Sequence, residues 1–262
     1  MSAEAALLAE LPQWAFGFVL VLARVGMTVM LLPGLGEAEI PAVIRAGLVL
    51  ALVFLLLPGL APMLPRQPDD IVVSASMLAT ELLVGLGLGW LARLVVLALP
   101  IAAQIVSYML GLANVLQPDP VLGGQATALE RLFAAAASVL VFVSGLYALP
   151  LMALAGSYRV VVPGASGTPV LVGDGVEAVI NAVAESFALA MQLAAPFVLA
   201  GILWQVALGL LARLVPRLQV YFVAMPGQLL GGFVLLGLLA TVLLGTWQAA
   251  VREGFSRLPG LG

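Results

Sequence analysis

The stretch ARVGMTVMLLPGLGEAEIPAVIRAGLVLALVFLLLP, residues 23–58, joins two apolar runs by a short turn. The first run covers residues 14–32 and is interrupted only by Arg24, and the second covers residues 42–57 with Arg45 near its start. A bilayer core about 30 Å thick needs about 20 helical residues at a rise of 1.5 Å each. Neither run alternates between apolar and polar residues, which favours helices over barrel strands. The stretch therefore predicts a helical hairpin of membrane-spanning length.

The whole chain has the composition of a membrane protein. It has 262 residues, of which 63% are hydrophobic and 9% are charged. A soluble domain has about 45–50% apolar and about 25% charged residues, so a water-soluble globule is excluded. Backbone polar groups in lipid need partners within the protein, which leaves helices or a closed barrel as spanning elements. We therefore expect an all-α, polytopic membrane protein built of helical hairpins.

The rest of the chain contains four more apolar regions, at residues 71–116, 128–156, 176–211 and 228–246. The first of these is too long for one span, and Pro100 within it favours a kinked helix or a pair of helices. Together the runs predict about six long helices in a single domain covering residues 1–262. The first run is not preceded by the basic residues of a secretory signal, so we expect it to remain in the mature protein.

The residue types present exclude most catalytic and metal chemistry. The chain has no Cys, no His and no Lys, and all ten basic residues are Arg. This removes thiolate nucleophiles, the Cys and His metal ligands, and Schiff-base lysines. No phosphate-binding loop, zinc-protease or serine-hydrolase motif occurs. The net charge of -3 is too small to indicate a nucleic-acid partner. We expect a protein that is not an enzyme and that needs no metal or cofactor.

Four charged residues lie inside apolar runs, where each costs about 2.5–3.5 kcal/mol at a helix centre: Arg24, Glu81, Arg93 and Glu185. They either border a pathway for a substrate or protons, or form pairs that fix how helices pack. Glu81 and Arg93 are about 18 Å apart on one straight helix, so each needs a partner elsewhere.

Glycines spaced by four residues predict close contacts between helices. The stretch ELLVGLGLGW, residues 81–90, holds Gly85 and Gly89 in a G-x-x-x-G pattern, and Gly227 and Gly231 form a second one. Small residues at this spacing let helix backbones approach closely. Such faces fit a subunit of an assembly, although a compact monomer also uses them.

The stretch RLVPRLQVYFVAMPG, residues 213–227, predicts a sharp turn between two long helices. Pro216 lacks an N–H and disrupts a continuing helix. Arg213 ends the preceding helix, where a cation suits the helix dipole. Arg217 begins the next segment and is expected to be exposed to water or to lie near an acidic partner.

Four blocks in order resemble the FliR/SctT-type family of type III secretion export apparatus proteins. They are residues 23–58, residues 81–90, LGLANVLQPDP at 110–120, and the long block APFVLAGILWQVALGLLARLVPRLQVYFVAMPG at 195–227. The first contains the family's arginine, its Pro-x-hydrophobic-Gly turn and its Ile-Pro-x-x-hydrophobic-Arg helix start. Each block alone is a weak match in so apolar a chain, but four in the right order and spacing are specific.

The resemblance implies a non-enzymatic integral membrane subunit of an export gate. It implies assembly with FliP-like and FliQ-like subunits, and contact with other export-gate membrane proteins and with lipid. Unfolded flagellar proteins would pass through the resulting pore, in the flagellar basal body at the bacterial inner membrane. Much of the apolar surface would then pack against partner subunits.

The resemblance also implies roles for particular residues. A loop near the pore that acts as a gate or plug would contain Gly111, Asn114, Gln117, Asp119 and Pro120. Contacts that support assembly would involve Arg24, Arg45, Glu81, Gly85, Gly89, Arg213, Pro216 and Arg217. Glu81 would be buried and paired between subunits, and Arg217 stands where the family often has Gln.

Three other readings of the chain remain open. The equivalent subunit of a virulence injectisome shares the same blocks, and only the overall pattern favours the flagellar system. A multi-helix permease subunit would carry a dense polar cluster at the membrane midplane and broken helices in matching halves. The chain has Pro100 and Pro196 but no such cluster. An intramembrane hydrolase needs a nucleophile, a carboxylate pair or a metal motif, and none is present.

Overall fold

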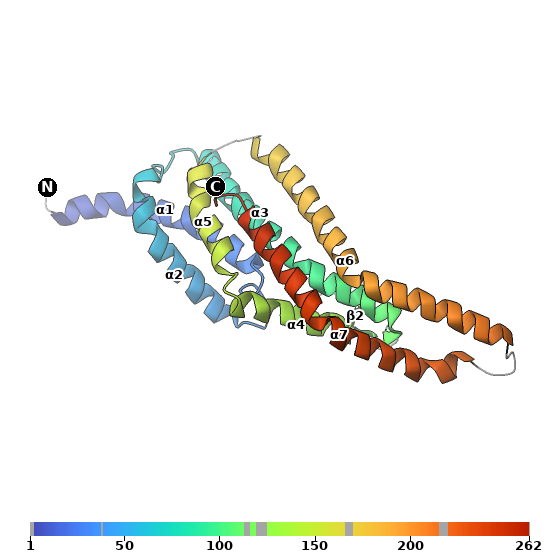
Figure 1. Cartoon of the computed structure of the whole chain (residues 1–262). Coiled ribbons are helices and arrows are strands. Elements are labelled where there is room, and N and C mark those ends of the chain that lie inside the picture. The colour runs from blue at the N-terminus through green and yellow to red at the C-terminus, as the bar shows by residue number, and fades with distance from the viewer. Residues whose placement is uncertain are drawn as a thin grey trace. The chain divides into compact units, whose positions relative to one another are not determined.

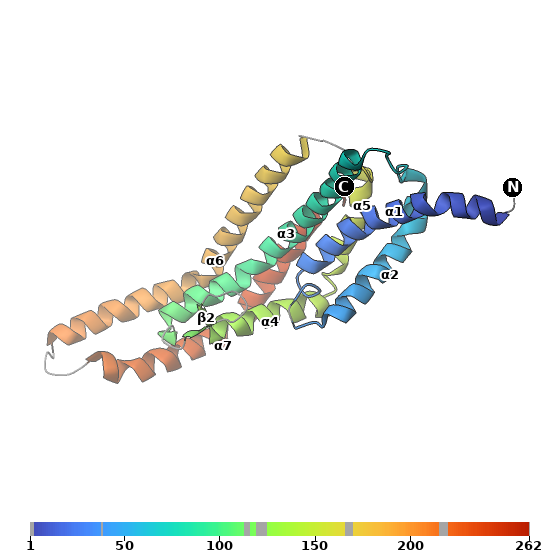
Figure 2. The same ribbon diagram turned by 180° about the vertical axis from the view of Figure 1, so that it is seen from behind.

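A computed structural model describes residues 3–37, 39–112, 116–118, 125–165, 170–214 and 220–261. The long helices follow one another along the chain as Figures 1 and 2 show: α1 (Ala3–Leu31), α2 (Ala42–Leu60), α3 (Ile71–Met109), α4 (Ala128–Val143), α5 (Ala148–Val160), α6 (Val170–Leu214) and α7 (Val220–Ser256). A single 3₁₀ turn, η1 (Ala61–Met63), follows α2. The expected all-α fold is confirmed.

Two short strands are the exception to the helices in the described residues. β1 (Leu116–Pro118) pairs with β2 (Gln125–Thr127) in antiparallel fashion, with Gln117 opposite Ala126. The pair lies between the end of α3 and the start of α4.

The number of membrane-length helices agrees with the expected six. Five helices are long and apolar enough to cross a membrane, and α4 with α5 adds a sixth if this broken pair is one span. The region at residues 71–116 does not contain two helices. Residues 71–109 form the single helix α3, which continues through Pro100 and ends at Met109. The chain therefore has the helices of a multi-pass membrane protein.

Side chains fix two of the helix starts. Asp70 accepts a hydrogen bond from the Val72 N–H at 2.8 Å, which satisfies a free donor in the first turn of α3. At the start of α4, Glu130 accepts from the Thr127 N–H at 3.3 Å, and the Thr127 hydroxyl oxygen accepts from the Glu130 N–H at 3.1 Å. This reciprocal pair is a capping box.

The chain divides into two compact units. The first contains Met1–Leu94, Val141–Ala182 and Glu253–Gly262, and the second contains Val95–Leu140 and Val183–Arg252. The first unit is built around the buried face of α1, formed by Leu20, Val21, Val25 and Val29. The second is built around the buried side chains of Leu99, Val106, Phe197 and Trp247. The expected single domain over residues 1–262 stays a prediction.

Candidate functional site

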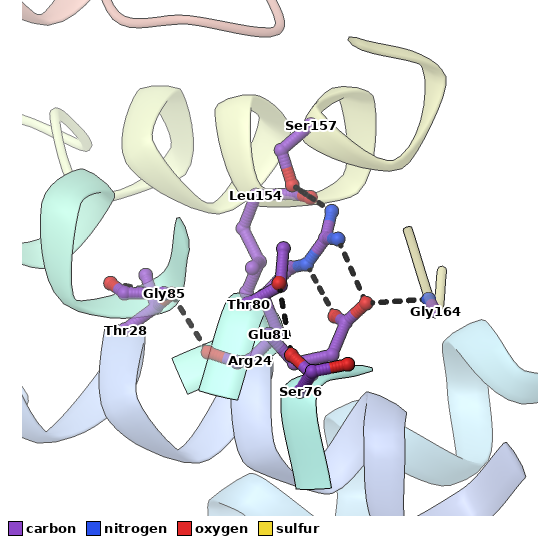
Figure 3. A network of polar contacts seen from close by, with 9 residues as sticks. All are labelled: Arg24, Thr28, Ser76, Thr80, Glu81, Gly85, Leu154, Ser157 and Gly164. Atoms are coloured by element: carbon purple, nitrogen blue, oxygen red, sulfur yellow. Dashed lines mark hydrogen bonds and ion pairs between the residues drawn. The ribbon is translucent and has the colours of Figure 1, made fainter. Parts of the chain in front are cut away.

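The first unit encloses an ion pair between Arg24 of α1 and Glu81 of α3 (Figure 3). Arg24 Nε donates to Glu81 Oε2 at 2.7 Å, and Arg24 Nη2 donates to Glu81 Oε1 at 3.1 Å. Both side chains are 0% exposed. Two parallel bonds between a guanidinium and a carboxylate fix both the distance and the orientation of the two helices.

Groups from the α5 region complete the surroundings of this pair. Arg24 Nη1 donates to the Ser157 hydroxyl oxygen at 3.2 Å, and Ser157 in turn donates to the Leu154 carbonyl at 2.7 Å. The Gly164 N–H donates to Glu81 Oε1 at 2.9 Å. The guanidinium carbon of Arg24 also lies 4.2 Å from the centre of the Tyr158 ring, which adds a cation–π contact. We name these five residues, Arg24, Glu81, Ser157, Tyr158 and Gly164, the buried polar network.

Glycines let α1 and α3 come close enough for this pairing. A Cβ atom at Gly85 would overlap the Arg24 carbonyl oxygen, and one at Gly89 would lie 2.7 Å from Leu31 Cβ. The Thr28 hydroxyl lies 3.1 Å from the Gly85 carbonyl oxygen, which it can reach only because the backbones are adjacent. The expected close helix contact at Gly85 and Gly89 is therefore confirmed.

The position of this contact corrects one expectation. Glu81 was expected to pair between subunits, but its carboxylate is fully buried against Arg24 of the same chain. Gly85 and Gly89 likewise face α1 of the same chain. The roles of Glu81, Gly85 and Gly89 in assembly stay predictions.

Two other charged residues of the apolar runs differ in their surroundings. Arg93 Nη2 lies 3.5 Å from Glu37 Oε2, and the two side chains are 36% and 26% exposed. Arg93 therefore has the separate partner that its distance from Glu81 requires. Glu185 lies exposed on α6.

Arg45, in the first turn of α2, has no carboxylate partner among the described residues. Its Nη1 lies 3.9 Å from Met30 Sδ. Its Nε is buried and has no hydrogen-bond partner among the described residues. Its expected role in assembly stays a prediction.

The described part of the expected gate loop begins at the end of α3. Gly111 follows the helix with a φ of 75°, a conformation that suits glycine. Gln117 lies in β1, and Asn114, Asp119 and Pro120 lie outside the described residues. The Ser107 and Thr127 hydroxyl oxygens, both fully buried, are 2.9 Å apart and connect α3 to the start of α4. The residues that flank this segment are thus held together, and its role as a gate stays a prediction.

The turn after α6 is only partly described. Arg213 lies exposed in the last turn of α6, as expected for a cation at a helix end, and Pro216 and Arg217 lie outside the described residues. Farther along, no described residue of this chain lies within 4 Å of a Cβ built at Gly231, so the close contact predicted there is not made within the described part of the chain. Gly232 makes the close contact instead, against Leu110.

No metal-binding group is found in the ranges that the structure describes, where no three His, Cys, Asp or Glu side chains come together. The buried polar network has its carboxylate fully engaged by Arg24 and Gly164. Its chemistry is that of a fixed, paired charge that holds helices.

Sequence reasoning missed most partners in the buried polar network. It identified Arg24 and Glu81 separately, but it did not connect them or identify Ser157, Tyr158 and Gly164. Gly164 follows Pro163 in a loop that carries no motif, so the sequence contains no pattern that would have identified it. The charges of Arg24 and Glu81 inside apolar runs were the one feature of the sequence that indicated a buried partner.

The sequence is similar to proteins of one family. Residues 15–254 match the bacterial export proteins, family 1. The flagellar biosynthetic protein FliR of Caulobacter vibrioides is 32% identical over 89% of this chain and 92% of its own length. The protein of the same name from Bacillus subtilis is 28% identical over 91% of this chain and 90% of its own length. The Yop proteins translocation protein T of Yersinia pestis is 29% identical over 80% of each chain.

Proposed function

The chain belongs to family 1 of the bacterial export proteins, and we propose that it is a non-enzymatic subunit of a flagellar type III protein export apparatus. The observation that carries this proposal is similarity over nearly the whole length of proteins named for flagellar biosynthesis. The five or six apolar helices support a multi-pass location in a membrane. For a bacterial flagellar system this membrane is the inner membrane, at the basal body.

The subunit forms the core of an export pore together with FliP-like and FliQ-like subunits. Large apolar side chains exposed on α6 and α7 support this arrangement. Examples are Leu203 (68% exposed) on α6 and Leu238 (72% exposed) on α7. Large apolar side chains exposed to this degree along two long helices are covered in the functional state, by neighbouring subunits or by lipid. Unfolded flagellar proteins are the exported substrates.

The segment around residues 111–120 acts as the gate or plug of this pore. Support comes from the residues that flank it, since the Ser107 hydroxyl of α3 and the Thr127 hydroxyl before α4 lie 2.9 Å apart. The buried polar network holds α1, α3 and α5 of the first unit in register. In this scheme the network is a structural element, and the gate lies elsewhere in the chain.

A virulence injectisome is the second candidate system. The Yop translocation relative, which is 29% identical over 80% of this chain, favours it. The flagellar candidate ranks first because the flagellar relatives match a larger share of the chain.

Co-purification tests the proposed partnership. A tagged chain is co-expressed with FliP-like and FliQ-like subunits from the same organism, and the membranes are solubilised in mild detergent. The proposal predicts that both subunits elute with the tag in a single high-mass complex. A tagged, unrelated multi-pass protein serves as the control. Recovery of the chain alone, with both partners abundant in the membrane, would contradict the proposal.

Parallel pull-downs with injectisome subunits separate the two candidate systems. Preference for the flagellar set is the expected result. Preference for the injectisome set would favour the second candidate.

A further inference from the structure

The second unit contains a backbone carbonyl that its own helix cannot satisfy. Pro100 lies within α3 and has no N–H. The carbonyl of Val96, four residues earlier, therefore lacks its helical donor. The Val96 side chain is only 6% exposed and Pro100 is buried, so bulk water is excluded from this part of the helix. Buried backbone carbonyls in native proteins are nearly always paired.

Trp247 of α7 supplies the missing donor. Its indole N–H donates to the Val96 carbonyl at 3.3 Å, and Trp247 is 0% exposed. The two residues are 151 positions apart in the sequence. A tryptophan offers both a large apolar surface and one N–H donor, so it can fill the space beside the proline and satisfy the carbonyl at once.

A second carbonyl of α3 is satisfied by α7 in the same way. Met109 is the last residue of α3, where the final four carbonyls of a helix have no helical donor. The side-chain amide of Gln228 donates to the Met109 carbonyl at 2.8 Å. Next to this bond, Leu110 packs so closely against Gly232 that a Cβ there would overlap the Leu110 side chain.

We propose that Trp247 and Gln228 are positioning residues that fix the C-terminal segment of α3, residues 96–109, to α7. Both acceptors are carbonyls that α3 leaves unpaired, and both donors are side chains of one helix. The bonds lie at the two ends of this segment of α3, and Figures 1 and 2 show α3 and α7 side by side. The segment therefore moves with α7 as one body whose limits on α3 are Val96 and Met109.

One consequence rests on the proposed function. The segment at residues 111–120 starts directly after the bond from Gln228, so α7 sets the position from which the proposed gate begins. The bonds themselves do not depend on that function, and the first two tests below measure them without it.

The first test is a double-mutant cycle on the full chain in detergent. Heated samples are scored by the fraction that remains monodisperse in size-exclusion chromatography. Trp247→Phe keeps most of the ring but loses the N–H, and we expect its midpoint to fall by about 2–4 °C. Pro100→Ala restores a backbone N–H that can donate to the Val96 carbonyl. In the Pro100→Ala background, Trp247→Phe should therefore lower the midpoint temperature by less than half as much. Equal losses in both backgrounds would mean that Trp247 only fills space and would overturn the proposal.

Matched substitutions control this cycle. Trp90→Phe removes an indole that is 46% exposed and should leave the midpoint unchanged. Pro196→Ala restores an N–H within α6 and should not rescue Trp247→Phe. Rescue by Pro196→Ala as complete as that by Pro100→Ala would also contradict the proposal, because removal of any helical proline would then suffice.

The second test is a charge series at Gln228, which keeps the proposal testable if Pro100→Ala does not fold. Lys can donate to the Met109 carbonyl and suits the negative end of the helix dipole, whereas Glu cannot donate and is repelled. We expect Gln228→Lys to melt at a higher temperature than Gln228→Glu, with the apolar Gln228→Met between them. Equal or reversed midpoints for Lys and Glu would refute the role of Gln228.

Export assays on these variants separate this inference from the proposed function. Loss of the Pro100→Ala rescue would refute the inference whatever the chain exports. Intact rescue, together with an unsubstituted chain that restores no export to a strain lacking the gene, would leave the inference standing and contradict the proposed function.

Discussion

Removing one partner of the Arg24–Glu81 pair should destabilise the first unit strongly. Glu81→Met deletes a carboxylate that accepts three hydrogen bonds, two from Arg24 and one from the Gly164 N–H. The Arg24 guanidinium would then remain at 0% exposure with Ser157 and the Tyr158 ring as its remaining contacts. An uncompensated buried charge of this kind costs about 3–5 kcal/mol.

This cost predicts a large shift in melting temperature. At about 2–4 °C per kcal/mol for a chain of this size, Tm should fall by about 6–20 °C. Arg24→Met combined with Glu81→Met should recover most of the loss, because replacing both members of a buried pair by apolar residues is often neutral or stabilising. The measurement is thermal unfolding of the full chain in detergent, followed by the monodisperse fraction.

A matched control is available in the exposed pair of Glu253 and Arg257, whose side chains are 65% and 58% exposed. Glu253→Met should change the unfolding free energy by less than about 1 kcal/mol. The single Glu81→Met variant should also weaken co-purification with the partner subunits, and the double variant should restore it. A Tm loss in Glu81→Met no larger than in Glu253→Met, or a double variant that is worse than either single one, would refute the reasoning.

Three further changes test other parts of the account. Gly85→Ala should lower Tm, because the added methyl overlaps the Arg24 carbonyl oxygen. Gly87→Ala, with no described residue within 4 Å of the added methyl, should be neutral or stabilising by up to about 1 kcal/mol. Equal effects of the two changes on thermal unfolding would argue against a close helix contact. Deletion of residues 113–117 should make assembled complexes leaky to small solutes in a flux assay, and an unchanged leak would show that this loop is no plug. Arg217→Gln should export normally if Arg217 is a solvated tip, and a clear export defect would assign it a partner.

The features that were predicted correctly are determined by residues close to one another in the sequence. Apolar length and the absence of alternation predicted the membrane-length helices of the chain. The spacing of Gly85 and Gly89 predicted a close helix contact, because a G-x-x-x-G pattern makes a flat face on any helix. The pattern could not show which helix would cover that face, and this is why an assembly contact was expected where α1 of the same chain lies.

The features that sequence reasoning missed depend on distant residues. Arg24 and Glu81 are 57 positions apart, and their pairing follows only from the packing of α1 on α3. Within the described part of the chain, Gly232 and not Gly231 packs against Leu110. The two glycines face different directions because one residue turns a helix by about 100°. Trp247 and Gln228 belong to no motif, and only the structure connects them to the unpaired carbonyls of α3.

Secretion by a strain that lacks this gene measures the proposed role in protein export. Flagellar proteins are measured in the culture medium and in the cells, with and without the gene restored from a plasmid. We expect that secretion stops while the same proteins remain present inside the cells, and that the intact chain restores it. Undiminished secretion in the deletion strain would contradict a role in export.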